Sequence, residues 1–245
     1  MKLVCINVER SKHLDRVQAF LQAQQPDIFC LQELCARDVA RYEHLTGNPG
    51  LYVPLARHPA EVEMEPMGVG IFSRHPLGNA QVHYYRGSPD TLPDIAFDPA
   101  IPQHVPLPHS FHQAVASVVL HGICFATTHL TVTLRGQATP EQLALAELIV
   151  THARDLTARH GALVLCGDFN APRGRATFDL LAQAMTDNIP ATYTSSIDGG
   201  LHRAGNIPFM VDGMFSAGAV AVRDVALHTG VSDHCALVGT VTADR

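Results

Sequence analysis

Short apolar runs alternate with helical patterns along almost the whole sequence, and this alternation restricts the possible folds more than any other feature. Apolar runs predict strands at 3–8, 27–32, 68–73, 80–85, 114–120, 123–129, 162–166, 207–215, 219–227 and 235–241. Helical spacing of apolar residues predicts helices at 13–25, 38–45, 177–184 and from Thr139 past Leu156. With no repeat, linker or low-complexity segment, we expect residues 1–245 to form a single α/β domain.

The charge balance argues against a protein that grips long nucleic acid. The net charge is −6, and the 17 Lys and Arg residues are scattered along the chain. Binding to long nucleic acid draws most of its non-specific affinity from a basic surface that neutralises phosphates. The sequence also lacks Trp and has five Tyr, which leaves little material for stacking exposed bases.

The six cysteines form no C-x-x-C pair, so a structural zinc site is not expected. Cys5, Cys30, Cys124 and Cys166 lie within apolar runs, where a free thiol behaves as a small buried hydrophobe, as suits a reducing cytoplasm. We see neither a signal-peptide pattern nor an apolar stretch long enough to span a membrane. We therefore expect a cytoplasmic monomer.

Polar residues recur at the ends of the apolar strands. Those that follow a strand are Asn7, Glu33, His129, Asp168 and Asn170, Asp212 interrupts one, and Asp233 and His234 precede the last. Sites in α/β sheets form at strand ends, where loops converge on a rigid scaffold. Asn, Asp and Glu supply hard oxygen donors, which suit Mg²⁺ (or Mn²⁺) better than zinc. The histidines could donate to phosphate oxygens or manage a proton.

Each of these residues also has a plain structural interpretation. Asn7 could be a turn residue, and Asp168 with Asn170 could form an Asx turn before Pro172. Glu33 could be a solvated loop carboxylate, and a half-buried histidine such as His129 is common. The ordered set is far more specific than any of its members.

In this order the motifs resemble those of the endonuclease/exonuclease/phosphatase superfamily over nearly the whole chain. They are INV at 6–8, LQE at 31–33, GIFSR at 70–74, THL at 128–130, GDFNAP at 167–172, VDGMF at 211–215 and SDH at 232–234. The resemblance implies a four-layer α/β/β/α sandwich of two mixed β-sheets flanked by helices. It also implies a Mg²⁺- or Mn²⁺-dependent phosphoric ester hydrolase in which water attacks phosphorus.

The resemblance further implies a role for each residue. Glu33 is the expected principal metal ligand, with Asn7 and Asp233. Asp168 is expected to orient or deprotonate the attacking water, and Asn170 to donate to a phosphate oxygen. His234 is the expected phosphate-contacting histidine with Asp212 as its carboxylate partner, and His129 occupies a further phosphate-touching position.

Two departures from the family pattern bear on the pocket. Gly213 stands where many relatives carry an aromatic residue, and Glu9 stands where many carry a second polar residue, so Glu9 could add a carboxylate to the metal site.

The substrate stays open at this stage. Length and charge favour a small or flexible phosphoester, with a DNA-repair nuclease as the alternative and a non-catalytic phosphate-binding protein as a third reading. Specificity is expected from loops 86–111 and 194–207. The first carries Arg86, His104, His109 and His112, and the second His202, Arg203 and Asn206. Arg135 and Arg203 are the predicted substrate-binding cations.

Overall fold

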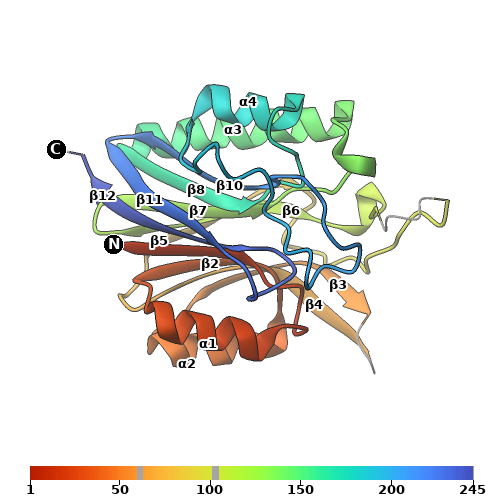
Figure 1. The fold of residues 1–245 in the computed structure, drawn as a ribbon, viewed down its shortest axis with the longest axis horizontal. Coiled ribbons are helices and arrows are strands. Elements are labelled where there is room, and N and C mark those ends of the chain that lie inside the picture. The colour runs from red at the N-terminus through yellow and green to blue at the C-terminus, as the bar shows by residue number, and fades with distance from the viewer. Residues whose placement is uncertain (60–62, 101–104, 245) are drawn as a thin grey trace.

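The computed structural model describes residues 1–59, 63–100 and 105–244, which form two six-stranded β-sheets packed face to face (Figure 1). The predicted His104 lies outside these residues. The first sheet has the order β11-β12-β1-β2-β4-β3 and the second β5-β6-β7-β8-β10-β9. The strands of the first sheet are β1 (Lys2–Asn7), β2 (Ile28–Cys35), β3 (Leu51–Pro59), β4 (Met64–Ser73), β11 (Val220–His228) and β12 (Ala236–Ala243). Those of the second are β5 (Gly78–Arg86), β6 (Gln113–Leu120), β7 (Ile123–His129), β8 (Ala162–Asp168), β9 (Thr186–Asp187) and β10 (Asp212–Gly218).

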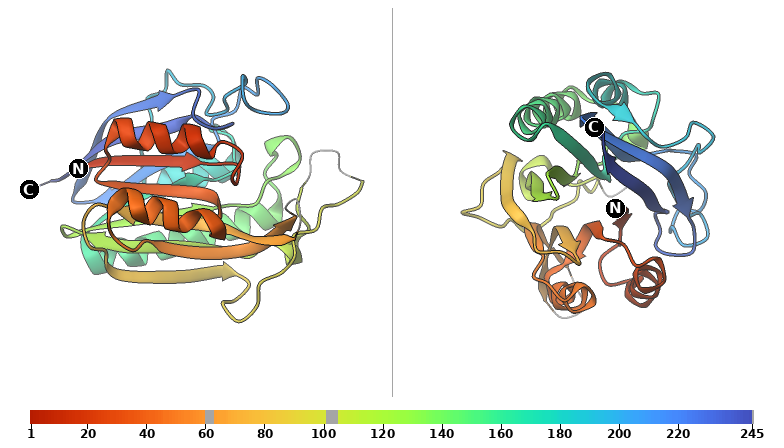
Figure 2. Two further views of the ribbon diagram at one scale, coloured as in Figure 1. Left: turned by 90° about the horizontal axis from the view of Figure 1, so that it is seen from below. Right: turned by 90° about the vertical axis from the view of Figure 1, so that its left-hand side faces the viewer.

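Helices cover the outer face of each sheet. Helices α1 (Leu14–Gln24) and α2 (Val39–Thr46) lie on the first sheet, and α3 (Pro140–His160) and α4 (Ala176–Ala184) on the second (Figures 1 and 2). Three apolar clusters fill the three interfaces, the central one between the two sheets and one beneath each helix pair. This arrangement confirms the four-layer sandwich that the sequence predicted.

One parallel strand pair in each sheet brings functional residues to the same edge. Strands β1 and β2 run parallel with Asn7 beside Gln32, and β7 and β8 run parallel with His129 beside Asp168. Strand β10 pairs antiparallel with β8 so that Asp212 lies opposite Asp168. The carboxyl ends of these parallel strands therefore meet at one end of the sandwich, as the strand-end argument predicted.

Helix α3 begins and ends where the sequence signals indicated. Thr139 Oγ1 accepts a hydrogen bond from the backbone N–H of Gln142 at 3.1 Å, and Pro140 occupies the first turn. Gly161 ends the helix in the left-handed conformation with φ 76°. Gln142 forms no capping box, because its buried side-chain oxygen accepts from Thr177 Oγ1 at 2.8 Å.

Other sequence expectations were wrong in detail. Residues 207–211 were expected to belong to a strand that Asp212 interrupts, but β10 begins at Asp212 itself and 207–211 form a loop. Strand β3 was not foreseen, because Pro54 and Pro59 disguise an edge strand. On α3, Leu145 and Ile149 are buried, whereas Leu148 is 46% exposed.

All six cysteines are free and buried, which agrees with the placement of four of them in apolar runs. No helix among the described residues is both long enough and apolar enough to cross a membrane.

Candidate active site

Asp168 lies at the centre of the candidate site, at the end of β8, and is 1% exposed. Its Oδ2 accepts a hydrogen bond from the side-chain amide of Asn7 at 3.0 Å, and its Oδ1 accepts one from the backbone N–H of Asn170 at 2.8 Å. The Nε2 atoms of His129 and His234 lie 3.6 and 3.8 Å from Oδ2. Burial raises the pKa of Asp168, although the nearby histidines act against it. A buried carboxylate of raised basicity suits a group that takes a proton from water.

His234 and Asp212 form the expected pair. Nδ1 of His234 donates to Oδ2 of Asp212 at 2.7 Å. Burial alone would lower the pKa of His234, but the carboxylates of Asp212 and Asp168 raise it well above its usual value. The imidazole is therefore charged at neutral pH, with Nε2–H available to an anion.

Backbone contacts hold this pair in place through part of loop 194–207, for which the sequence predicted a role in specificity only. Ser196 Oγ accepts from the backbone N–H of Asp212 at 3.1 Å, and Cys235 N–H donates to the carbonyl of Ser196 at 2.7 Å. The backbone N–H of Asp198 donates to the carbonyl of Asp233 at 2.8 Å. Loop 196–198 thus joins the start of β10 to the Ser-Asp-His segment.

Asn170 and His129 stand together at the other side of Asp168. The side-chain amide of Asn170 donates to the carbonyl of Leu130 at 2.9 Å and lies 3.1 Å from Nε2 of His129. Asn170 has φ 48°, a left-handed conformation that Asn tolerates better than most residues. Gln142 also donates to the carbonyl of Asn170 at 3.3 Å, so the start of α3 helps to fix this turn.

Acidic side chains gather beside this centre, where the metal was predicted. Glu33, with φ 53°, accepts from the side-chain amide of Asn7 at 3.2 Å and pairs with Arg10 at 3.3 Å. Asp233 is 7% exposed, and its Oδ1 accepts from Ser232 at 3.2 Å. Burial and the nearby carboxylates of Glu33 and Glu9 raise the pKa of Asp233 to about 7, against the effect of His234. Like charges held this close favour a bound cation.

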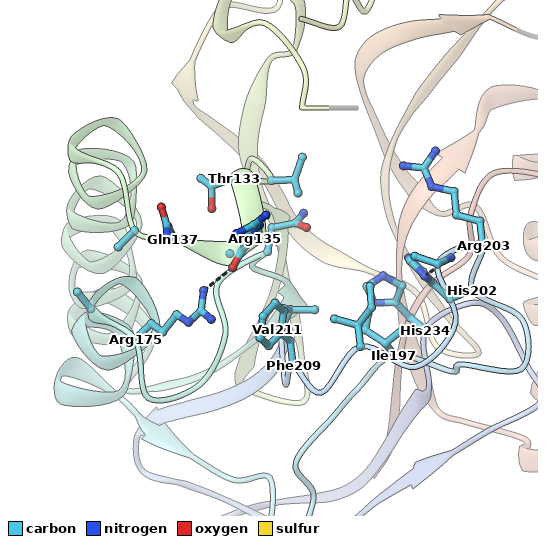
Figure 3. Close-up of a pocket in the computed structure, with 17 residues that line it drawn as sticks. Thr133, Arg135, Gln137, Arg175, Ile197, His202, Arg203, Phe209, Val211 and His234 are labelled. Atoms are coloured by element: carbon cyan, nitrogen blue, oxygen red, sulfur yellow. Dashed lines mark hydrogen bonds between the residues drawn. The ribbon is translucent and has the colours of Figure 1, made fainter. Parts of the chain in front are cut away.

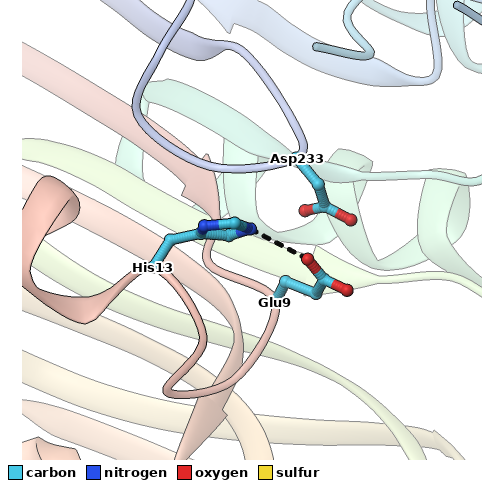
Figure 4. A group of neighbouring side chains, drawn as sticks. All are labelled: Glu9, His13 and Asp233. Atoms are coloured by element: carbon cyan, nitrogen blue, oxygen red, sulfur yellow. Dashed lines mark hydrogen bonds and ion pairs between the residues drawn. The ribbon is translucent and has the colours of Figure 1, made fainter. Parts of the chain in front are cut away.

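Glu9 and His13 also belong to this region. The sequence gave Glu9 a minor place in the metal site and did not indicate His13. Glu9 accepts from Lys12 Nζ at 2.6 Å and contacts His13 Nε2 at 2.9 Å. Glu9, His13 and Asp233 bring one possible ligand atom each to within 4.8 Å of one another (Figure 4). The spacing of His13 four residues after Glu9, at the start of a helix, is the signal that could have found it.

Two cavities meet at Asn170 and His234. A cleft of about 490 Å³ is lined by Glu9, Glu33, Asp168 and Asp233, among others. A larger pocket of about 1120 Å³ extends from it toward α3 and α4 (Figure 3). Both are lined by Asn170, His234 and the predicted cation Arg203, whereas Arg135 lines the larger pocket only.

The walls of the larger pocket are mainly apolar. They include Val132, Ile197, Ile207, Phe209 and Val211 (Figure 3). Arg175, which the sequence reading missed, lies over the ring of Phe209 at 4.6 Å from its centroid. The buried hydroxyl of Thr133 also lines the pocket and has no hydrogen-bond partner among the described residues.

Comparisons with known proteins agree with this fold. The model of the Endonuclease/Exonuclease/phosphatase family matches residues 6–234, and the chain belongs to this family. Members of the family are generally hydrolases that act on phosphate esters. No curated protein matches the sequence.

Three solved structures illustrate the breadth of the fold. The human Nocturnin catalytic domain has a TM-score of 0.67 and 17% identity, covering 99% of this chain and 93% of that one. The 3′-5′ exonuclease NExo of Neisseria meningitidis has a TM-score of 0.66 and 21% identity, covering 100% of both chains. A mannosyl-6-phosphatase of Bacteroides thetaiotaomicron has a TM-score of 0.67 and 11% identity, covering 99% of both. At such identities the likeness shows the shared fold.

Proposed function

We propose that this protein is a divalent-metal-dependent hydrolase of phosphate esters that acts on a small or flexible substrate. The observation that carries the proposal is the position of Asp168, buried between Asn7, Asn170 and two histidines in the wall of the smaller cleft. Its neighbours Asn170 and His234 line both cavities. A water molecule beside this carboxylate would face a phosphorus atom held near His234 and Asn170.

Each side chain has a separate role in the proposed reaction. Asp168 accepts the proton of the attacking water, and its raised pKa makes it a stronger base than an ordinary aspartate. The charged His234 donates from Nε2 to a phosphate oxygen, while Asp212 fixes its orientation through Nδ1. His129 and Asn170 lie where they would contact the remaining phosphate oxygens.

The acidic cluster fits a divalent cation. Glu9, Glu33 and Asp233 supply carboxylate oxygens, and burial together with the carboxylates of Glu33 and Glu9 raises the pKa of Asp233. When bound, Mg²⁺ or Mn²⁺ polarises a phosphate oxygen and offsets the negative charge that develops in the transition state. Asn7, which contacts both Glu33 and Asp168, connects this cluster to the water-activating residues.

The larger pocket supports an ester whose organic group is partly apolar. Its aliphatic walls and the Arg175–Phe209 pair would cover a hydrocarbon or ring body, and the unpartnered hydroxyl of Thr133 could bond a polar substituent. Arg203, at the mouth of both cavities, could hold a second anionic group. The negative net charge adds to the case against a long duplex.

A substrate screen tests the proposal. Phosphomonoesters and diesters with alkyl, aryl, nucleoside and sugar groups would be assayed with Mg²⁺, Mn²⁺ and chelator, beside plain and abasic duplex DNA. We expect metal-dependent release of product from esters with apolar groups, with a shallow salt dependence because few phosphates are contacted. Steeply salt-dependent binding and cleavage of abasic duplex would instead support a repair nuclease. Metal-independent binding without turnover of any ester would support a non-catalytic protein.

Substitutions in the larger pocket test whether the substrate binds there. Ile207→Ser removes part of the pocket wall and should raise KM for the apolar esters more than it lowers kcat. Arg203→Ala, like Arg135→Ala, should act in the same direction for esters with a second anionic group. Leu148→Ser, on the exposed face of α3, is the matched control and should leave both constants unchanged.

A further inference from the structure

His13 brings a nitrogen donor to the acidic cluster. It precedes α1, and its side chain is only 9% exposed. Figure 4 shows its imidazole pointing toward Glu9, with the carboxylate of Asp233 above that of Glu9. One ligand atom from each of these three residues lies within 4.8 Å of the other two.

The two oxygens of Glu9 face different partners. Oε1 lies 2.6 Å from Lys12 Nζ and 3.8 Å from Arg10, whereas Oε2 lies 2.9 Å from Nε2 of His13. Lys12 and Arg10 therefore hold one oxygen of the carboxylate and leave the other aimed at the histidine. Among the described residues, the ring of His13 hydrogen-bonds no side chain other than Glu9.

The separation of these two atoms suits adjacent ligands of one cation. Donors at about 2.1 Å from an octahedral ion, and at right angles to each other, lie roughly 3 Å apart. The 2.9 Å between Glu9 Oε2 and His13 Nε2 agrees with this spacing. A hydrogen bond joins the two atoms when no cation is bound, and a bound cation would take the place of the bridging proton.

We propose that His13 is a direct ligand of the catalytic cation, together with Glu9 and Asp233, and that its nitrogen makes the site prefer Mn²⁺ over Mg²⁺. Magnesium favours oxygen ligands and sheds its waters reluctantly, whereas Mn²⁺ and the transition-metal ions that follow it accept imidazole more readily. The proposal rests on the proposed function only in taking this cation to be the one used in hydrolysis.

The competing explanation makes His13 a positioning residue that orients Glu9 by a hydrogen bond and never touches the ion. Affinity alone cannot separate the two, because removal of an outer hydrogen-bond partner also weakens metal binding, by about 10- to 100-fold. A direct bond differs in placing a nitrogen nucleus in the first coordination sphere, where the electron spin of Mn²⁺ detects it.

Electron spin echo envelope modulation of the full chain tests the bond. The protein is stripped with chelator and loaded with one equivalent of Mn²⁺. We expect ¹⁴N modulation in the wild type and its loss in His13→Gln. His58→Gln is the matched control, because His58 lines the same cleft from β3 and should leave the modulation intact. Absence of ¹⁴N modulation in the wild type, or its loss in the His58 variant alone, overturns the proposal.

A second variant tests whether a lost signal in His13→Gln could come from misfolding. His13→Asp places a favoured helix-capping residue before α1, so it should fold, and it replaces the nitrogen by an oxygen donor. We expect it to lack ¹⁴N modulation. A normal signal from this variant contradicts a bond from His13.

Calorimetric titration tests the proposed preference for Mn²⁺ over Mg²⁺. The wild type should bind Mn²⁺ at least about 10-fold more tightly than Mg²⁺, and His13→Gln should weaken Mn²⁺ by about 10- to 100-fold with a much smaller effect on Mg²⁺. Equal weakening of both ions points to positioning and overturns the proposal. None of these measurements needs turnover, so nitrogen-bound Mn²⁺ in a protein that hydrolyses no ester would refute the proposed function alone.

Discussion

The water-activating centre (Asp168, Asp212 and His234) and the acidic cluster (Glu9, Glu33 and Asp233) lie side by side. They differ in how their negative charges are balanced. In the first, Asp168 and Asp212 are each matched by amide groups or a charged imidazole. In the second, the carboxylate of Asp233 faces Glu9 and Glu33, and its pKa rises to about 7. The first centre is complete within the protein, whereas the second favours a cation from solution. Substitutions should therefore affect catalysis in one region and metal binding in the other.

Asp168→Asn should cause the largest loss, because it removes the proposed base. We expect kcat to fall by about 10³-fold, within the range for general-base catalysis, while the affinity for Mn²⁺ changes by only a few fold. Steady-state kinetics and calorimetric titration measure the two quantities. The control is Asp224→Asn, the same change at an exposed position on β11. An equal loss of metal affinity in Asp168→Asn would show that the two centres are not separate.

His234→Ala and Asp212→Asn should each lower kcat by about 10²-fold, and the double variant should lose little more, because the two side chains act as a unit. Additive losses would indicate that Asp212 has a purely structural role.

The same pair should set the alkaline limb of the pH–rate profile. The active imidazole is protonated, and Asp212 raises its pKa, so activity should fall only as pH rises through that raised value. Asp212→Asn removes one source of the shift and should move the alkaline limb to lower pH. A limb that stays in place would mean that another group titrates there.

Glu33→Gln should alter the metal requirement more than the chemistry. We expect the Mg²⁺ or Mn²⁺ concentration for half-maximal activity to rise by about 10- to 100-fold, because a charged ligand is replaced by a neutral one of the same shape. Circular dichroism should show an unchanged fold. An unaltered metal titration would remove Glu33 from the metal site and leave Glu9, Asp233 and His13 as its ligands.

Asp233→Asn should stabilise the protein in the presence of chelator. A carboxyl whose folded pKa lies at about 7, above the usual 3.8, binds its proton more tightly in the folded state. Wild-type stability is therefore lost as pH rises from about 4 through about 7. At pH 8 the variant should be more stable by on the order of 2–4 kcal/mol, with little difference at pH 4.

Urea unfolding at the two pH values measures this difference. Saturating Mn²⁺ should reverse the order, because only the wild type retains the ligand. A variant that is less stable than the wild type at pH 8 without metal would show that Asp233 is already satisfied by the protein.

The sequence indicated most strands and helices because periodicity is a local property, whereas the four layers were implied by the family resemblance. Apolar runs marked β1, β2, β7 and β8, and helical spacing marked the helices that cover the two sheets. It failed at β3, where prolines obscure an edge strand, and at 207–211, where an apolar run is a loop that lines a pocket. The reason is that apolar residues in a pocket wall leave the same local pattern as those in a strand.

By itself the sequence determined which chemical groups this protein could use, because the donors and the order of their motifs are written along the chain. The pairing of Asp212 with His234 could be expected from that order, and the structure joins them at 2.7 Å. The tertiary structure decided which acids are neutralised within the protein and which are not. It placed Glu9 and His13, from one turn after β1, against Asp233 near the other end of the chain. Which acids are neutralised depends on the packing of the two sheets and on the path of loop 196–198. Charges interact through space, and the distances between them are set only when the sheets close on each other.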